Sequence, residues 1–184
     1  MGRSLTELLG ETLAVRLGGA HTLAEVASVT LVGSSAGGPA IATLLDDDDL
    51  HGRIHNVVLS DSLYGSESTF ARWLRGAPDR RLVCIHGGMR YTSPHAAMLR
   101  PAPGDQVVVE PRGAMTEAIR THRAVFAMVY CEHIGMGIAY LDKVLMGLDL
   151  PRRAPDPKTP VDPAPAPAAV VTTGSAKRVG TPCA

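Results

Sequence analysis

Short apolar runs separated by polar or glycine-rich segments recur through the first 150 residues of the chain. Each is about four residues long, and the first two end at Gly33 and Asp61, which is typical of buried strands rather than helices. We therefore predict four strands, at residues 29–32, 57–60, 82–85 and 106–109.

Helical patterns lie between these runs. Ser4-Leu5-Thr6-Glu7 has the form of a capping box and predicts a helix that continues to about Leu17. Apolar residues Phe70, Trp73 and Leu74 have the spacing of a buried helical stripe. Further helices are expected at 38–45, 93–99, 115–130 and 137–148. Apolar strands that alternate with helices predict an α/β fold, with a mainly parallel sheet and helices on both faces.

The composition changes sharply near Pro151. Eight of the fourteen prolines lie from this residue onward, and no aromatic residue follows Tyr140. We therefore expect one folded domain over residues 1–150 and a disordered tail, rich in proline and alanine, over residues 151–184.

Charge and hydropathy narrow the class of partner. The chain has 18 basic residues (Lys and Arg) and 18 acidic residues (Asp and Glu). Its net charge is therefore zero and would not attract nucleic acid or an anionic membrane. No apolar run approaches the roughly 20 residues of a membrane span, and the N-terminus lacks a secretory stretch. The chain as written is expected to be cytoplasmic, with a small molecule or another protein as partner. Its widely spaced cysteines, Cys84, Cys131 and Cys183, indicate reduced thiols.

The segment Gly33-Ser34-Ser35-Ala36-Gly37 follows the first predicted strand and precedes a predicted helix. A Gly-x-Ser-x-Gly turn in this context is typical of a nucleophile elbow, in which the central serine has a strained backbone and stands above the sheet. Gly33 and Gly37 would remove side chains that collide in so tight a turn. The N–H of Ala36, at the helix N-terminus, is a candidate donor to an oxyanion.

Other interpretations of this segment remain open. A loop rich in glycine and serine can connect a strand to a helix without any chemistry. A phosphate-binding loop is disfavoured because neither Gly-x-Gly-x-x-Gly nor Gly-Lys-Ser/Thr is present. Ser34 is an alternative nucleophile, but the glycine spacing centres on Ser35.

A serine nucleophile requires a base and an orienting acid. His133 is the candidate base because it follows the predicted strands and precedes the last helix; the alternative is a surface or capping histidine. Asp61 is the candidate acid because it ends the strand after the nucleophile strand, although a turn aspartate would have the same position. Asp105 and Glu110 are less well placed substitutes.

No metal or cofactor is expected. The acidic run Asp46–Asp49 is interpreted as a solvated loop, and the glycine between His51 and His55 argues against one helical metal-binding face. His86 and His95 are interpreted as structural residues or residues that line the site.

Three stretches resemble poorly characterised bacterial α/β-hydrolase-like proteins, in which a serine elbow precedes a Leu-Asp-x-Leu-Tyr-Gly segment and a late histidine. The resemblance covers roughly residues 4–150 and implies a triad of Ser35, Asp61 and His133 that hydrolyses an ester or amide. It is based on Val32-Gly33-Ser34-Ser35-Ala36-Gly37-Gly38, on Val57-Val58-Leu59-Ser60-Asp61-Ser62-Leu63-Tyr64-Gly65 with Phe70 and Trp73, and on His133-Ile134-Gly135-Met136-Gly137.

A second resemblance is confined to one motif. Gly33-Ser34-Ser35-Ala36-Gly37-Gly38-Pro39 is similar to the serine motif of the chemotaxis protein-glutamate methylesterases. Those enzymes have Gln-His-Met after the next strand, where this chain has Ser60-Asp61-Ser62. The methylesterase interpretation therefore ranks second.

The chain departs from the α/β-hydrolase pattern at its start. Ser35 comes early, whereas that fold places several strands and an oxyanion-hole loop before its nucleophile. We expect one of three explanations: a gene fragment, a homo-oligomer or preceding segment that completes the sheet, or a non-catalytic module that binds a ligand or partner. An open sheet edge would favour pairing with another chain.

Overall fold

The structure is a computed structural model that describes residues 5–17, 25–46, 48–87, 95–96, 99, 106–109, 115–129, 140–148 and 150. The strands are β1 (Val29–Ser34), β2 (Ile54–Ser60), β3 (Arg81–Gly87), β4 (Gln106–Val109) and β5 (Ala124–Val129). The helices are α1 (Leu5–Leu17), α2 (Gly37–Leu45), α3 (Asp48–His51), α4 (Glu67–Arg75), α6 (Met115–Thr121) and α8 (Leu141–Gly147).

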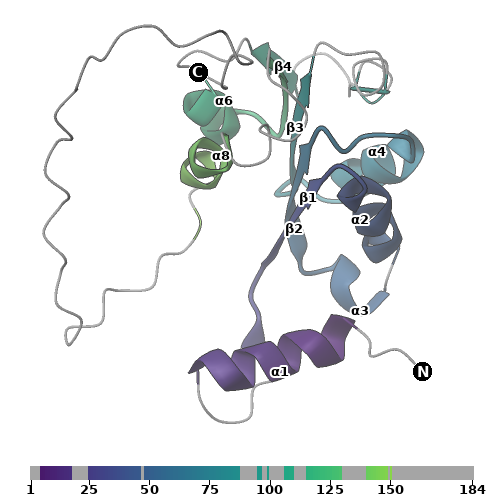
Figure 1. Ribbon diagram of the computed structural model, residues 1–184, viewed down its shortest axis with the longest axis vertical. Helices are drawn as coiled ribbons and strands as arrows, with labels where there is room; N and C mark the ends of the chain where they lie inside the picture. The colour runs from purple at the N-terminus through teal and green to yellow at the C-terminus, as the bar shows by residue number, and fades with distance from the viewer. Residues whose placement is uncertain are drawn as a thin grey trace, which may run out of the picture.

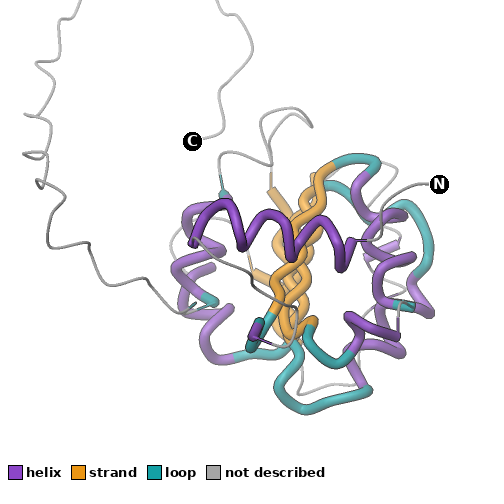
Figure 2. Tube along the Cα trace, turned by 90° about the horizontal axis from the view of Figure 1, so that it is seen from below, coloured by secondary structure: helices purple, strands orange, loops and turns teal. Residues whose placement is uncertain are grey.

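The strands form one five-stranded sheet in the order β1-β2-β3-β5-β4, and every neighbouring pair is parallel. Helices α2, α3 and α4 lie on one face and α6 and α8 on the other (Figure 1). The edge-on view in Figure 2 shows the sheet between the two helical layers, with α1 crossing its amino-terminal end. The predicted α/β fold, with a parallel sheet and helices on both faces, is confirmed.

Alternate residues of the central strands enter two separate cores. Val57 and Leu59 of β2 pack with Phe70 and Trp73 of α4, whereas Val58 packs on the opposite face with the residues of α6 and α8. Because successive side chains of a strand point to opposite faces, a strand covered on both sides must be apolar throughout. This requirement explains the continuous apolar runs in the sequence, and the predicted buried stripe of α4 is confirmed.

The expected helix over 115–130 is wrong in its second half. Helix α6 ends at Thr121, and Ala124–Val129 is strand β5, inserted between β3 and β4. Leu82 of β3 donates its N–H to the carbonyl of Arg123 at 2.8 Å, which anchors the start of this pairing. Phe126 is fully buried in the core beneath α4. The sequence has no glycine or proline between α6 and β5, so it does not mark where the helix ends. Pairing with β3 on one side and β4 on the other makes residues 124–129 a strand.

β1 lies at one edge of the described sheet and pairs only with β2. Its residues Val29, Thr30 and Leu31 are half-buried, and the side chain of Val32 is 47% exposed on the face opposite α2. Helices α6 and α8 cover β3 and β5 but do not extend over this strand (Figure 1). The strand that leads to Ser35 is therefore the least covered strand whose side chains are described.

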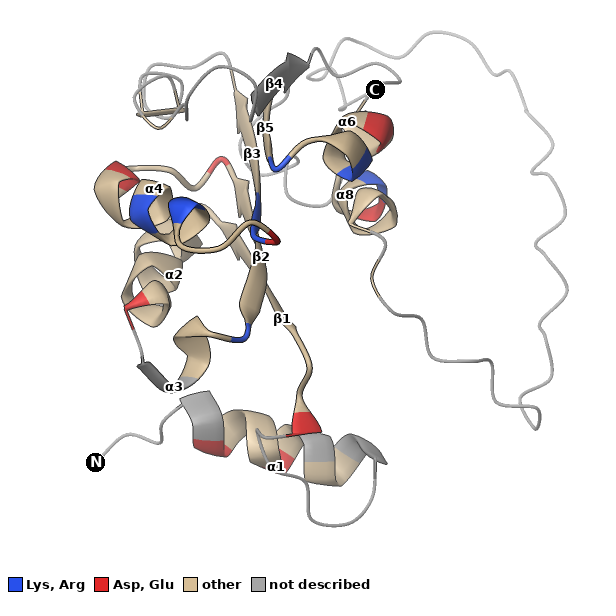
Figure 3. Cartoon of the chain, turned by 180° about the vertical axis from the view of Figure 1, so that it is seen from behind, with Lys and Arg blue, Asp and Glu red and all other residues tan. Residues whose placement is uncertain are grey.

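Charged residues lie mainly on the helices and at the ends of the strands, and both signs are interspersed (Figure 3). None of the helices in the described part of the chain combines the length and hydrophobicity that a bilayer crossing requires. Ser4, the remainder of the expected helix at 93–99 and the expected tail at 151–184 lie outside the described residues.

Candidate active site

Ser35 lies at the turn between β1 and α2 and has a left-handed backbone, with φ of 52°. Residues with a side chain seldom adopt this conformation, which costs roughly 1–3 kcal/mol and persists only where the surrounding structure imposes it. Ser35 is half-buried. The sequence-based prediction of an elbow-like turn centred on Ser35 is confirmed in its backbone geometry.

The glycines around Ser35 differ in how closely they are packed. A Cβ atom on Gly33 would lie 2.7 Å from Ile41 Cδ1 and 3.0 Å from the carbonyl carbon of Gly37. A Cβ atom on Gly37 would lie 3.9 Å from Ser62 Oγ, which is an ordinary van der Waals contact. On Gly38 it would lie 1.7 Å from the main-chain oxygen of Ser62. The expectation that Gly37 prevents a collision is therefore wrong, and Gly38 has this role.

Ser35 and Asp61 directly follow two neighbouring strands whose last residues are paired. Ser34, the last residue of β1, pairs with Ser60, the last residue of β2, so Ser35 and Asp61 are the first residues beyond the two strands. Asp61 is also left-handed, with φ of 43°, and is 8% exposed. Its N–H donates to the carbonyl of Ile85 on β3 at 2.7 Å. The structure thus brings the predicted nucleophile and the predicted acid to the carboxyl edge of two adjacent strands.

The loop after β2 is attached directly to the turn that holds Ser35. The hydroxyl of Ser62 donates to the main-chain oxygen of Ser35 at 2.7 Å. The N–H of Ser35 donates to the carbonyl of Ser60 at 3.3 Å. Because Gly38 allows the Ser62 backbone to approach α2, these contacts fix the loop against the start of the helix.

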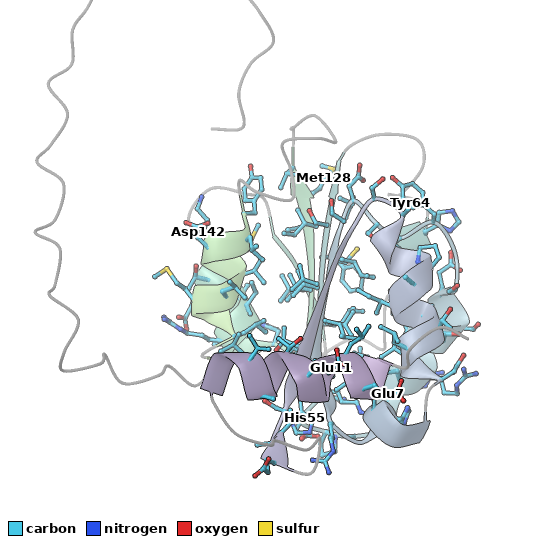
Figure 4. The ribbon with its side chains drawn as sticks, turned by 60° about the horizontal axis from the view of Figure 1, so that its bottom comes forward. Glu7, Glu11, His55, Tyr64, Met128 and Asp142 are labelled. Carbon is cyan, nitrogen blue, oxygen red and sulfur yellow. The ribbon has the colours of Figure 1, made fainter. Side chains whose placement is uncertain are left out.

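Tyr64 also interacts with Ser35 and was not singled out by the sequence analysis. Burial and the nearby charge of Asp61 raise the pKa of the phenol, in that order, and a hydrogen-bonding interaction with the Ser35 side chain opposes this rise. Figure 4 shows Tyr64 at the same end of the sheet as Met128 of β5, and His55 at the other end. The sequence signal for this residue was its position three residues after Asp61, immediately before Gly65.

The charge of Asp61 also affects the buried thiol of Cys84. Burial and, secondarily, this charge raise the pKa of Cys84 from 9.0 to about 12. The folded protein therefore holds the thiol proton more tightly than the unfolded chain does. Stability from this group is fully present below about pH 9 and is lost as the pH rises toward about 12.

This difference predicts an alkaline loss of stability that depends on Cys84. Between pH 8 and pH 10.5 the loss attributable to the thiol should be about 2 kcal/mol. It is measured by urea unfolding of the wild type and Cys84→Ala at both pH values. Cys84→Ala is expected to be less stable at pH 8, because it leaves a cavity, but to lose less between the two pH values. Equal losses in both proteins would contradict the prediction.

The predicted base, His133, lies outside the described residues, as do the substitute acids Asp105 and Glu110. The last described residue of β5, Val129, pairs with Gly87 at the end of β3 and precedes His133 by four positions in the sequence. Ala36, the predicted oxyanion donor, is exposed and immediately precedes α2.

Two other histidines lie within the described residues near this edge of the sheet. His86 is buried near the carboxyl end of β3, one residue after Ile85, which binds the N–H of Asp61. His95 Nδ1 is hydrogen-bonded to a carboxylate oxygen of Glu67, at the start of α4. The expectation that they are structural or line the site stays a prediction for both.

No protein-family model, curated protein or solved structure matches the chain.

The described residues contain no group of three or more His, Cys, Asp or Glu side chains that could hold a metal ion. His51 Nδ1 is hydrogen-bonded to the carbonyl of Leu45 at 2.8 Å, and His55 Nε2 lies 3.7 Å from Asp79 Oδ2. The two histidines of the i, i+4 pair thus have different partners.

Proposed function

We propose that this protein is a serine hydrolase that cleaves an ester or amide with Ser35 as nucleophile. The observation that carries the proposal is the left-handed backbone of Ser35 at a strand-to-helix turn, with Asp61 at the end of the adjacent strand. A strained serine at this position presents its oxygen at a helix N-terminus, where N–H groups favour developing negative charge.

In the proposed reaction, Ser35 Oγ attacks the substrate carbonyl while His133 accepts the hydroxyl proton. The N–H of Ala36 donates to the oxyanion of the tetrahedral intermediate. His133 then returns the proton to the leaving alcohol or amine as the bond to the carbonyl carbon breaks. A water molecule attacks the acyl-enzyme in the same manner and releases the acid, which regenerates Ser35. Asp61 orients His133 and stabilises its charged form.

A non-catalytic module that binds a ligand or partner is the second candidate function. Among the described residues, Ser60, Ser62 and Tyr64 are the hydrogen-bonding neighbours recorded for Ser35, and no histidine is among them. A left-handed serine without a base would retain the architecture of the turn but not the chemistry. A labelling experiment separates the two candidates.

The direct test is reaction of the native protein with a fluorophosphonate probe, followed by peptide mapping of the adduct. An adduct on Ser35 of the folded protein supports the hydrolase. Folded protein that remains unlabelled at high probe concentration contradicts it and leaves the binding module. An adduct on Ser34 would contradict the assignment of the nucleophile.

The base is tested by comparing three histidine variants. We expect His133→Ala to lower the rate of fluorophosphonate labelling by about 10²- to 10⁴-fold, because general base catalysis contributes this much. His86→Ala and His95→Ala are the matched variants and should retain rates within a few fold of the wild type when folded, as monitored by circular dichroism. A normal rate in folded His133→Ala would contradict its role.

A further inference from the structure

Tyr64 lies in a short loop, between β2 and α4, whose backbone is closely determined. Asp61, Gly65 and Ser66 all have positive φ, at 43°, 131° and 64°. Asp61 binds β3 through its N–H, and the Ser62 hydroxyl binds the main-chain oxygen of Ser35. The relative position of Tyr64 and Ser35 is therefore imposed by the backbone and not by the side chains alone.

Tyr64 is much more exposed than the two residues that precede it in the loop. Ser62 and Leu63 are almost completely buried, whereas Tyr64 is 41% exposed. Tyrosine combines a large apolar ring with a polar hydroxyl, and a partly exposed tyrosine can use both to contact a bound molecule. The phenol thus lies beside the candidate nucleophile and also reaches solvent.

The ionisation of the phenol determines which role it can have. A tyrosine base would need a lowered pKa, but burial and the charge of Asp61 raise it above its ordinary value of 10.0. At pH 7 fewer than about one phenol in a thousand is then ionised. The hydroxyl is consequently a hydrogen-bond donor at neutral pH and a poor acceptor of the serine proton.

We propose that the Tyr64 hydroxyl is a second donor to the oxyanion formed when Ser35 attacks its substrate. This role rests on the proposed hydrolase function and adds a catalytic residue to it. The oxyanion forms on the carbon that becomes bonded to Ser35 Oγ, so a donor that reaches this oxygen also lies close to the new negative charge. Together with the N–H of Ala36, Tyr64 supplies the pair of donors that acyl transfer requires.

The test is Tyr64→Phe, which keeps the ring and removes only the hydroxyl. Its rate of fluorophosphonate labelling, and its kcat on a p-nitrophenyl ester, should fall by about 10²- to 10³-fold, as expected for loss of one oxyanion donor. KM should change by no more than about twofold, because the contact strengthens in the transition state. Ser68→Ala, which removes an exposed hydroxyl from α4, is the matched control and should keep the wild-type rate.

The pH profile separates a donor from a structural residue. In the alkaline range where both proteins remain folded, the wild-type rate should fall as the phenol ionises, at a pH above the ordinary pKa of 10.0, and Tyr64→Phe should lack this fall. Labelling of Tyr64→Phe at the wild-type rate would overturn the role of Tyr64 and leave the hydrolase intact. A wild-type protein that is folded but unlabelled would overturn both. A parallel fall of rate in both proteins while circular dichroism shows both to be folded would also overturn the donor role.

Discussion

Ser35→Ala should give a folded protein that no longer reacts with a fluorophosphonate probe and no longer hydrolyses esters. Alanine lacks the attacking oxygen, so labelling at this position should disappear entirely. The fold should survive, because the contact from Ser62 is made to the main-chain oxygen of Ser35, which alanine retains. Both residues have a Cβ atom and share the penalty of a left-handed backbone, so the melting temperature should change by only a few degrees.

The matched control for this change is Ser34→Ala. Ser34 is the exposed last residue of β1 and immediately precedes the nucleophile. It offers the same chemical group, but its backbone is part of the strand. Labelling of Ser34→Ala should therefore match the wild type. Residual labelling of folded Ser35→Ala at Ser34 would show that the left-handed turn does not select the nucleophile.

Gly38→Ala should destabilise the protein severely and also abolish labelling. The new methyl group would lie 1.7 Å from the main-chain oxygen of Ser62 and 2.8 Å from its carbonyl carbon. Backbone atoms cannot rotate away as the end of a long side chain can, so the loop that carries Asp61 and Tyr64 must move. We expect a loss of about 3 kcal/mol or more, at the upper end of overpacking effects, and a melting temperature lower by roughly 10 °C.

Gly37→Ala tests whether this effect is specific to one position. Gly37 is the adjacent residue of the same helix, and a Cβ atom there would make only ordinary contacts. Alanine is also the better helix former by about 1 kcal/mol. Gly37→Ala should therefore be as stable as the wild type or more stable, and should be labelled normally. If both variants lost stability equally, the close contact between Gly38 and Ser62 would not be the cause.

The fold could be predicted largely from the apolar runs. Strands β2 and β3 contribute residues to both cores, so their sequences are apolar at consecutive positions and stand out, and β1 has a similar apolar run although one of its faces is partly exposed. Strand β5 has the same property, but only His122 and Arg123 separate it from α6. Without a turn residue between them, helix and strand were merged into one predicted helix.

The part of the candidate site that lies at the ends of strands could be predicted from the sequence. Ser35 and Asp61 immediately follow the last residues of the neighbouring parallel strands β1 and β2, and this arrangement follows from the order of elements along the chain. The proximity of Tyr64 to Ser35 depends instead on left-handed residues within an irregular loop, which local patterns do not reveal. Gly38 was overlooked for a related reason, because its close contact arises between two segments that are distant in sequence.

Three left-handed residues with side chains, Ser35, Asp61 and Ser66, lie within two short segments at one edge of the sheet. Each conformation is held in place by neighbouring contacts against a local preference of roughly 1–3 kcal/mol. Local unfolding should therefore begin in these two segments, where it releases the backbone strain, while the two hydrophobic cores remain folded. On heating, reactivity toward the probe should disappear at a lower temperature than the one at which the helices melt.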